Sequence, residues 1–274
     1  MLILFKVSHP GRQRPYHLQP NPISASDVQL EGEVLGNLYG KPRPATEKDI
    51  QSVIEGFAHA AEFLDKAGFD GIQLHAAHGY LLSQFLSETT NFKTDKYGGS
   101  LVNRMRLIFE IRDAVAERVR PGFIIGVKIN SVEFQPKGFQ PEEASELCAS
   151  LEAHKFDFVE LSGGTYENWQ MNSDNKRDST KKREAVCLTS FQFLRLTVAN
   201  VLYFFLDFAQ QIVSSLSKTK SYLTGGFRSA EGMVKAPDTI DGVGLARPLC
   251  QEPFVFSDIG SKDRRCSHST RQPV

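Results

Sequence analysis

Three residues suited to chemistry lie close together near the first third of the chain. His75, His78 and Tyr80 directly follow the apolar run 71–74. Histidine and tyrosine side chains donate hydrogen bonds and exchange protons, so this trio could hold a polar group and act on it as an acid or a base. A buried strand that delivers such side chains at its carboxyl end is typical of the functional rim of a parallel α/β barrel. We therefore interpret this segment as the end of a strand and the start of a candidate site.

Other interpretations of the trio remain open at this level. Two histidines three positions apart are found in metal sites, but no third Cys, His or acidic residue follows at a convincing spacing, so we expect no metal. Either histidine could equally be a core residue with its hydrogen bonds satisfied, and Tyr80 could serve packing alone. A lysine at position 128 is harder to explain by structure, because a lone lysine in the apolar run 123–129 would bury a charge without a partner.

The composition describes an ordinary globular protein. The 274 residues are 41% hydrophobic and 23% charged, and 32 basic residues balance 32 acidic ones, so nothing favours nucleic acid or an anionic membrane as partner. The apolar run 198–206 is much shorter than the roughly 20 residues of a membrane-spanning helix. The four cysteines lack the spacing of a metal site or a disulfide framework, and the first residues lack the features of a signal peptide. We expect a cytoplasmic protein with reduced thiols.

Strands and helices alternate along the chain. The strands read as continuous apolar runs, which indicates a parallel sheet covered by helices, and polar and glycine residues cluster after the strands rather than before them. This pattern predicts a TIM (β/α)8 barrel that is incomplete, with about six of its eight βα units. Strands are expected near residues 1, 71, 123, 157, 221 and 239, and helices over 46–66, 81–86, 100–118, 141–154, 203–216 and 229–236.

Several motifs taken together resemble those of the Old Yellow Enzyme family, closest to its fungal NADH:flavin oxidoreductase branch. The resemblance covers roughly residues 7–185 and 203–253. It implies a TIM barrel that binds FMN, takes hydride from NADPH or NADH and reduces activated C=C bonds such as those of enones. The motifs are His75-Ala76-Ala77-His78-Gly79-Tyr80-Leu81, Tyr97-Gly98-Gly99-Ser100 with Asn103-Arg104, Gly225-Gly226-Phe227-Arg228 and Gly244-Leu245-Ala246-Arg247-Pro248.

The resemblance assigns roles to particular residues. His75 and His78 match the pair that holds the carbonyl oxygen of the substrate, where charge develops as hydride arrives. Tyr80 matches the tyrosine often assigned as proton donor to the α-carbon. Lys128 matches the basic residue beside the N1/O2 edge of the flavin. A phosphate clamp is implied at Gly225, Gly226, Ala246 and Arg247, with Arg228 a weaker candidate; a tight turn is the alternative for the two glycines. The segment 97–104 is expected to be mainly structural.

Three departures from the family pattern stand out. The first two βα units have no counterpart, and Lys6 occupies the place of a glutamine that contacts the flavin pyrimidine. Residues 186–202 are an apolar insertion, which we interpret as a retained intron or faulty gene model; the alternative is an extra helix lying on the barrel. The segment 254–274 is polar, lacks periodicity and is expected to be disordered, which leaves 1–253 as the barrel domain.

An open sheet exposes its edges, so we expect reduced stability and association with a second copy of the chain. The alternative to an ene-reductase is a non-catalytic barrel remnant that binds flavin weakly or not at all.

Overall fold

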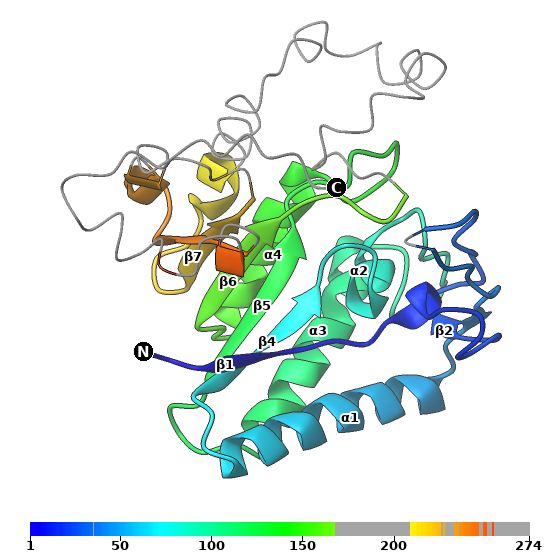
Figure 1. The fold of residues 1–274 in the computed structure, drawn as a ribbon, viewed down its shortest axis with the longest axis horizontal. Helices are drawn as coiled ribbons and strands as arrows, with labels where there is room; N and C mark the ends of the chain where they lie inside the picture. Colours follow the sequence, from blue (N-terminus) through cyan, green and yellow to red (C-terminus); the bar gives the residue numbers. More distant parts are fainter. Residues whose placement is uncertain are drawn as a thin grey trace, which may run out of the picture.

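The computed structural model describes residues 1–34, 36–167, 209–225, 227, 233–234, 236–246, 249–250 and 254. Its main feature is one sheet of six parallel strands that neighbour one another in chain order (Figure 1). This confirms the six βα units predicted from the sequence. The strands are β1 (Leu4–Val7), β4 (Gly71–Ala76), β5 (Ile124–Asn130), β6 (Phe158–Ser162), β7 (Lys220–Thr224) and β8 (Gly242–Gly244).

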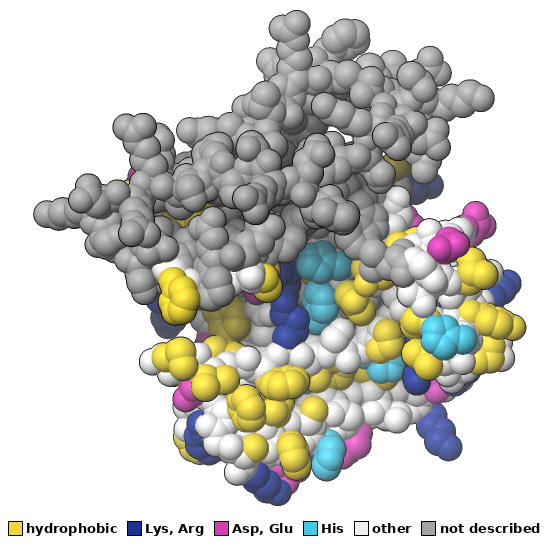
Figure 2. All heavy atoms as spheres, viewed as in Figure 1, with side chains coloured by type: hydrophobic (Ala, Val, Ile, Leu, Met, Phe, Trp, Pro, Cys, Tyr) yellow, Lys and Arg dark blue, Asp and Glu magenta, His cyan; other side chains and the backbone are white. Residues whose placement is uncertain are grey.

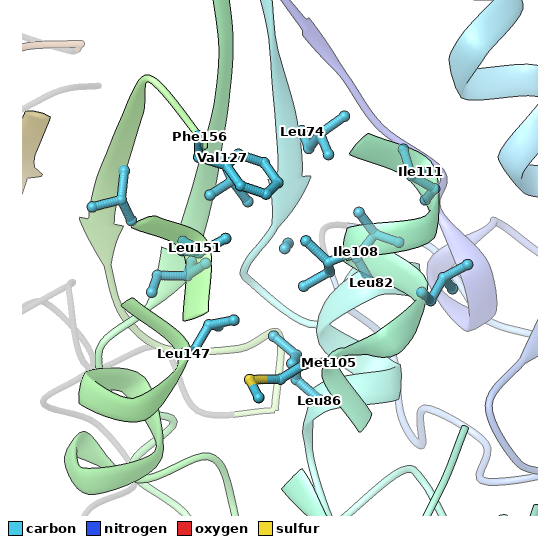
Figure 3. Close-up of a cluster of buried hydrophobic side chains, with 14 of the residues drawn as sticks. Leu74, Leu82, Leu86, Met105, Ile108, Ile111, Val127, Leu147, Leu151 and Phe156 are labelled. Carbon is cyan, nitrogen blue, oxygen red and sulfur yellow. The ribbon is translucent and has the colours of Figure 1, made fainter. Parts of the chain in front are cut away.

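Helices cover one face of this sheet and bury its apolar side chains. The helices are α1 (Glu47–Lys66), α2 (Leu81–Leu86), α3 (Leu101–Ala116) and α4 (Pro141–Ala153), and residues 209–213 are also helical. Leu74 and Val127, from neighbouring strands, pack with Ile108 and Leu151 of the covering helices (Figure 3). Because side chains alternate along a strand, the residues between these apolar positions emerge on the opposite face of the sheet.

The helix starts follow from local sequence. Thr46 caps α1 through a capping box, in which its side chain accepts from the Asp49 amide and the Asp49 carboxylate accepts from the Thr46 amide. Ser100 caps α3 by accepting from the amide of Asn103. Such caps satisfy backbone donors that have no partner inside the helix. The predicted boundaries of these two helices therefore agree with the structure to within two residues.

The segment before α3 is a scaffold, as predicted. The Tyr97 hydroxyl donates to Glu110, and the Asn103 amide donates to the carbonyl of Gly98. Arg104 is buried, donates to the carbonyls of Leu86 and Gly99 and pairs with Glu143. These contacts join the loop, α2, α3 and α4.

The segment 14–46 contacts the loop that follows α2, where the Phe92 amide donates to the Ser26 hydroxyl and Lys93 Nζ donates to the Ala45 carbonyl. It contains the short strands β2 (Ile23–Ser24) and β3 (Arg43–Pro44), which pair in parallel, and it follows the 3-10 turn η1 (Gly11–Gln13). A second 3-10 turn, η3 (Ala236–Asp238), precedes β8. The sequence pattern gave no such strands, because two-residue strands have no periodicity to detect.

The sheet curves as part of a barrel that does not close within the described residues. There, β1 pairs with β4 alone and β8 with β7 alone. Side chains of β1 and residues at the end of β8 nevertheless line one cavity of about 880 Å³. Apolar side chains are exposed beside the open edge at Leu2, Ile3, Phe5 and Phe63, and Figure 2 shows such side chains on this face. The incomplete barrel expected from the sequence is confirmed.

Some expectations fall on residues that the structure does not describe. The insertion 186–202, the segment 255–274 and the residues Gly226, Arg228 and Arg247 all lie outside the described part. Of the helix predicted over 229–236, only residues 233–234 are described as helical. Among the described helices, none is long and apolar enough to cross a membrane.

Candidate functional site

The predicted trio gathers at the carboxyl end of β4. His75 is the fifth residue of the strand and is buried on the face away from the helices, while Tyr80 is the residue that precedes α2. The centroid of the His75 ring lies 4.6 Å from that of Tyr80 and 5.2 Å from that of His78. The two imidazoles meet nearly edge to face, at 81°. Figure 2 shows histidine and lysine or arginine side chains together in the hollow of this face.

His78 has a left-handed backbone, with φ of 57°. A side chain makes this conformation costly, so the surroundings must hold it. Its amide donates to Asn130 Oδ1 at 3.2 Å, and its carbonyl accepts from Gln13 Nε2 at 3.1 Å. The imidazole Nε2 lies 2.8 Å from the Ser162 hydroxyl, which fixes the ring orientation. The next residue, Gly79, is also left-handed and sits against Gln13, where a β-carbon would lie 2.6 Å from Oε1. Side chains from three other segments therefore set the position of this loop.

Both imidazoles are neutral near pH 7. Burial is the main cause that lowers the pKa of His75 to about 3. Repulsion from His78 in its protonated form, and from Lys6 and Lys128, lowers this pKa further. Burial and the same lysines lower the pKa of His78 to about 4. A neutral imidazole keeps one N–H donor and one acceptor nitrogen. His75 Nδ1 is buried and has no hydrogen-bond partner among the described residues.

Lys128 is paired, which corrects the expectation that its charge would be buried alone. Its Nζ lies 2.7 Å from Glu160 Oε1 on the adjacent strand β6. The two residues are Cα partners in the strand register, and His75 is the partner of Lys128 on the other side. The structural role that the sequence argument considered hard to explain is therefore present. This structural role of Lys128 does not exclude a second role in binding a ligand.

Glu160 is the centre of a wider polar network on this face. It also accepts from Gln73 Nε2, at 2.6 Å, and from the hydroxyl of Thr224. Burial opposes ionisation of this carboxyl, but the ammonium of Lys128 and these donors outweigh it and lower its pKa to about 2. Lys6, on β1, is exposed, yet local desolvation and the nearby Lys128 lower its pKa. Glu160 thus forms an ion pair with Lys128 while Lys6 lies near both charges, and all three residues line the cavity.

The predicted phosphate clamp is described only in part. Gly225 follows β7 with a positive φ of 123°, and Ala246 follows β8 and lines the cavity. Gly226 and Arg247 lie outside the described residues. The backbone at both strand ends thus reaches the edge of the cavity that also holds Lys6 and Lys128.

Sequence reasoning missed three residues around the trio. Glu160 pairs with Lys128, Asn130 holds the His78 amide, and the Tyr166 hydroxyl lies 3.0 Å from that of Tyr80. Each is a polar residue in or just after a predicted strand, which is the signal that identified the trio. Applying that signal to β5 and β6 as well would have found them.

Comparison with known proteins places the chain in a family. A sequence model described as the NADH:flavin oxidoreductase / NADH oxidase family matches residues 1–262. An NADH-dependent flavin oxidoreductase of Aspergillus parasiticus is 61% identical over 258 residues, covering 94% of this chain and 54% of that protein. A 12-oxophytodienoate reductase of Oryza sativa subsp. japonica is 43% identical over 121 residues, covering 43% of this chain and 32% of that protein.

A solved structure supports the fold. A complex of 2-naphthoyl-CoA reductase with 2-naphthoyl-CoA superposes with a TM-score of 0.73 and 21% identity, over 92% of this chain and 37% of that one. The chain spans about half the length of the Aspergillus relative. The match over nearly the whole chain nevertheless fixes its ancestry: the chain belongs to the NADH:flavin oxidoreductase / NADH oxidase family.

Proposed function

We propose that this chain is an FMN-dependent oxidoreductase that reduces activated C=C bonds, such as those of enones, with hydride from NADH or NADPH. One observation carries the proposal. His75, Lys128 and Glu160 are in register on three adjacent strands and place neutral donors next to a cationic cavity. Donors at one end suit a substrate carbonyl, and cations at the other suit an anionic cofactor ring.

The cavity residues fit FMN. When bound, this cofactor passes a hydride from the nicotinamide to the substrate, and its reduced ring carries negative charge. Lys128 and Lys6 would face the pyrimidine edge of the ring, where their positive charge stabilises that form. Gly225 and Ala246 would offer backbone donors to the phosphate, with Gly226 and Arg247 completing the clamp. The volume of about 880 Å³ lies within the range of cofactor sites.

His75 and His78 would hold the oxygen of the substrate. Because both rings are neutral, each carries one N–H; for His78 this is Nδ1–H, with the Ser162 hydroxyl donating to Nε2. These donors strengthen as negative charge grows on the carbonyl oxygen. The unpartnered Nδ1 of His75 supports this role, since burial without a partner is costly unless a ligand completes the hydrogen bond. Fixed donors of this kind need no reorganisation during the reaction.

Tyr80 would deliver the proton to the α-carbon. Its ring stacks at a tilt over His75, so its hydroxyl and the donors of the oxygen site lie on the same side of the strand end. The proton moves from the phenol oxygen to carbon while the histidines keep the substrate oxygen in place. Residues 1–253 would form this barrel domain.

The relatives support the choice of hydride donor and substrate class. Their names state NADH dependence in one case and reduction of 12-oxophytodienoate in the other. We further propose that the chain works in the cytoplasm. A second copy would cover the exposed apolar residues Leu2, Ile3, Phe5 and Phe63 beside β1, because an exposed sheet edge favours association.

Two half-reactions test this function separately. Anaerobic NADH should bleach the flavin absorbance of FMN-loaded protein, and 2-cyclohexenone should then restore it with formation of cyclohexanone. The variant His75→Ala/His78→Ala should keep the rate of the first half-reaction, and the rate of the second should fall at least about a hundredfold. Bleaching without any re-oxidation by the enone would contradict the proposed substrate class. Absence of bleaching by both NADH and NADPH would contradict the proposed activity.

A further inference from the structure

Tyr166 lies against the proposed proton donor, although 86 positions separate the two residues in sequence. It belongs to the loop after β6, and its hydroxyl oxygen is 3.0 Å from that of Tyr80. The two rings meet edge to face, with centroids 5.9 Å apart at 73°. This contact joins the loops that follow β4 and β6 at the carboxyl end of the sheet.

The loop that carries Tyr166 is held on both sides. Its neighbour Glu167 forms an ion pair of 2.7 Å with Arg12, whose side chain is 2% exposed. Its other neighbour, Thr165, accepts from Gln135 Nε2 at 2.7 Å. Ion pairs to a buried guanidinium are geometrically restrictive, because the planar group presents its donors in fixed directions. The position of the Tyr166 ring is therefore set by segments other than its own strand.

Tyr166 keeps its proton. Burial, with the hydrogen bond to Tyr80, raises the pKa of Tyr166 well above that of a free phenol. A phenol that stays protonated can act as a donor, and its neighbour's oxygen is then the acceptor. When Tyr166 donates to Tyr80, the proton of Tyr80 is not used in this contact and can point elsewhere.

We propose, resting on the proposed function, that Tyr166 is a positioning residue for proton delivery by Tyr80. Its hydroxyl donates to the Tyr80 oxygen, aims the Tyr80 proton at the substrate and stabilises the phenolate left behind. In this step the O–H bond of Tyr80 breaks and a C–H bond forms at the α-carbon. The hydride arriving at the β-carbon supplies the electron pair, and water later returns a proton to the phenolate.

The other groups around Tyr80 do not substitute for Tyr166. The imidazole of His75 faces the Tyr80 ring and, like His78 beside it, is neutral near pH 7. Tyr39 is close enough for its pKa to respond to Tyr80, but its hydroxyl donates to the carbonyl of Val34 at 3.2 Å. Among the described residues, Tyr166 is the one whose hydroxyl lies at hydrogen-bonding distance from that of Tyr80.

The test compares Tyr166→Phe with Tyr16→Phe in FMN-loaded protein. Tyr16 is exposed and serves as the matched control. Reduced enzyme is re-oxidised either by 2-cyclohexenone, which requires a proton at carbon, or by ferricyanide, which does not. Loss of a hydrogen bond to a charged group predicts that Tyr166→Phe slows the enone reaction about ten- to a hundredfold. The ferricyanide reaction stays unchanged, and the solvent deuterium isotope effect on the enone reaction increases.

Two further variants separate positioning from general damage. In a Tyr80→Phe background, Tyr166→Phe should cause no further loss, because its effect acts through Tyr80. Tyr166→His, which retains a donor, should recover part of the rate. An equal loss with ferricyanide, additive losses in the double variant, or an unchanged enone rate would each overturn the inference while leaving the proposed function intact. A wild-type chain that takes up no FMN, or never reduces the enone, would overturn both.

Discussion

Lys128 Nζ lies 2.7 Å from Glu160 Oε1 across strands β5 and β6, on the face of the sheet that bears the candidate site. Both side chains are largely removed from water, with 6% and 16% of their surfaces exposed. A buried ion pair gains little over an apolar pair, but removing one partner leaves a charge that burial penalises strongly. The pair therefore supports the fold and also keeps the ammonium at a fixed place in the cavity.

Removing one member of this pair should destabilise the fold. We expect Lys128→Met to lower the free energy of unfolding by about 3–5 kcal/mol, because Glu160 is left buried without its cation. Lys128→Met/Glu160→Gln should recover much of this loss. Urea denaturation of the wild type, the single variant and the double variant measures the free energy of unfolding of each. Equal stability of the single and double variants would show that the pair does not bear on folding.

Acid should destabilise the protein through the site histidines. Their folded pKa values, about 3 and about 4, lie below the unfolded value of about 6.5, so the unfolded chain binds protons first as pH falls. Stability is therefore full above about pH 6.5 and decreases as pH falls from there toward about 4. His75→Asn/His78→Asn should show a smaller decrease between pH 7 and pH 5 in urea denaturation. An identical decrease in wild type and variant would contradict this account.

Asn130 should matter for both folding and substrate binding. Asn130→Ala removes the acceptor for the left-handed His78 amide, and a buried amide without a partner costs about 1–3 kcal/mol. The displaced His78 should also raise the KM for the enone, while reduction by NADH stays unaffected. Asn21→Ala, at an exposed position, is the matched control. Unchanged KM together with unchanged stability would exclude this role for Asn130.

The sequence predicted the strands and the trio because their signals are local. His75, His78 and Tyr80 follow one apolar run, so finding that run also places the three side chains near one another. The partners that complete the site depend on register between distant segments. The hydroxyls of Tyr80 and Tyr166 meet only because β4, β5 and β6 are neighbours in the sheet. No local pattern reveals such a contact.

The same reasoning explains the error at Lys128. Read within its own strand, the lysine is a lone charge in an apolar run. In the sheet, Glu160 stands at the neighbouring register position and neutralises it. The pairing was recoverable in principle, since Glu160 interrupts the next apolar strand in the same way. Which of these interruptions lie side by side can be predicted only once the register of the parallel strands is known.

Lys6 should tune the cofactor. It shares the cavity with Lys128, so it adds positive charge where the reduced ring is anionic. We expect Lys6→Gln to lower the midpoint potential of bound FMN and to weaken binding of reduced FMN more than binding of oxidised FMN. Spectroelectrochemical titration measures both. Lys41→Gln, at an exposed site outside the cavity, is the control. An unchanged potential would place Lys6 away from the ring.

The central claim is that this chain binds FMN at the carboxyl ends of its strands, beside the part of the cavity that is lined by Lys128, Gly244 and Ala246. The most direct measurement is titration of the purified chain with FMN, following the quenching of flavin fluorescence and the shift of its absorbance. The account predicts saturable binding of one FMN per chain and clearly weaker binding by Lys128→Met/Glu160→Gln, the double variant in which no buried charge is left unpaired. A chain that stays colourless after incubation with FMN, and leaves the flavin fluorescence unchanged, would contradict it.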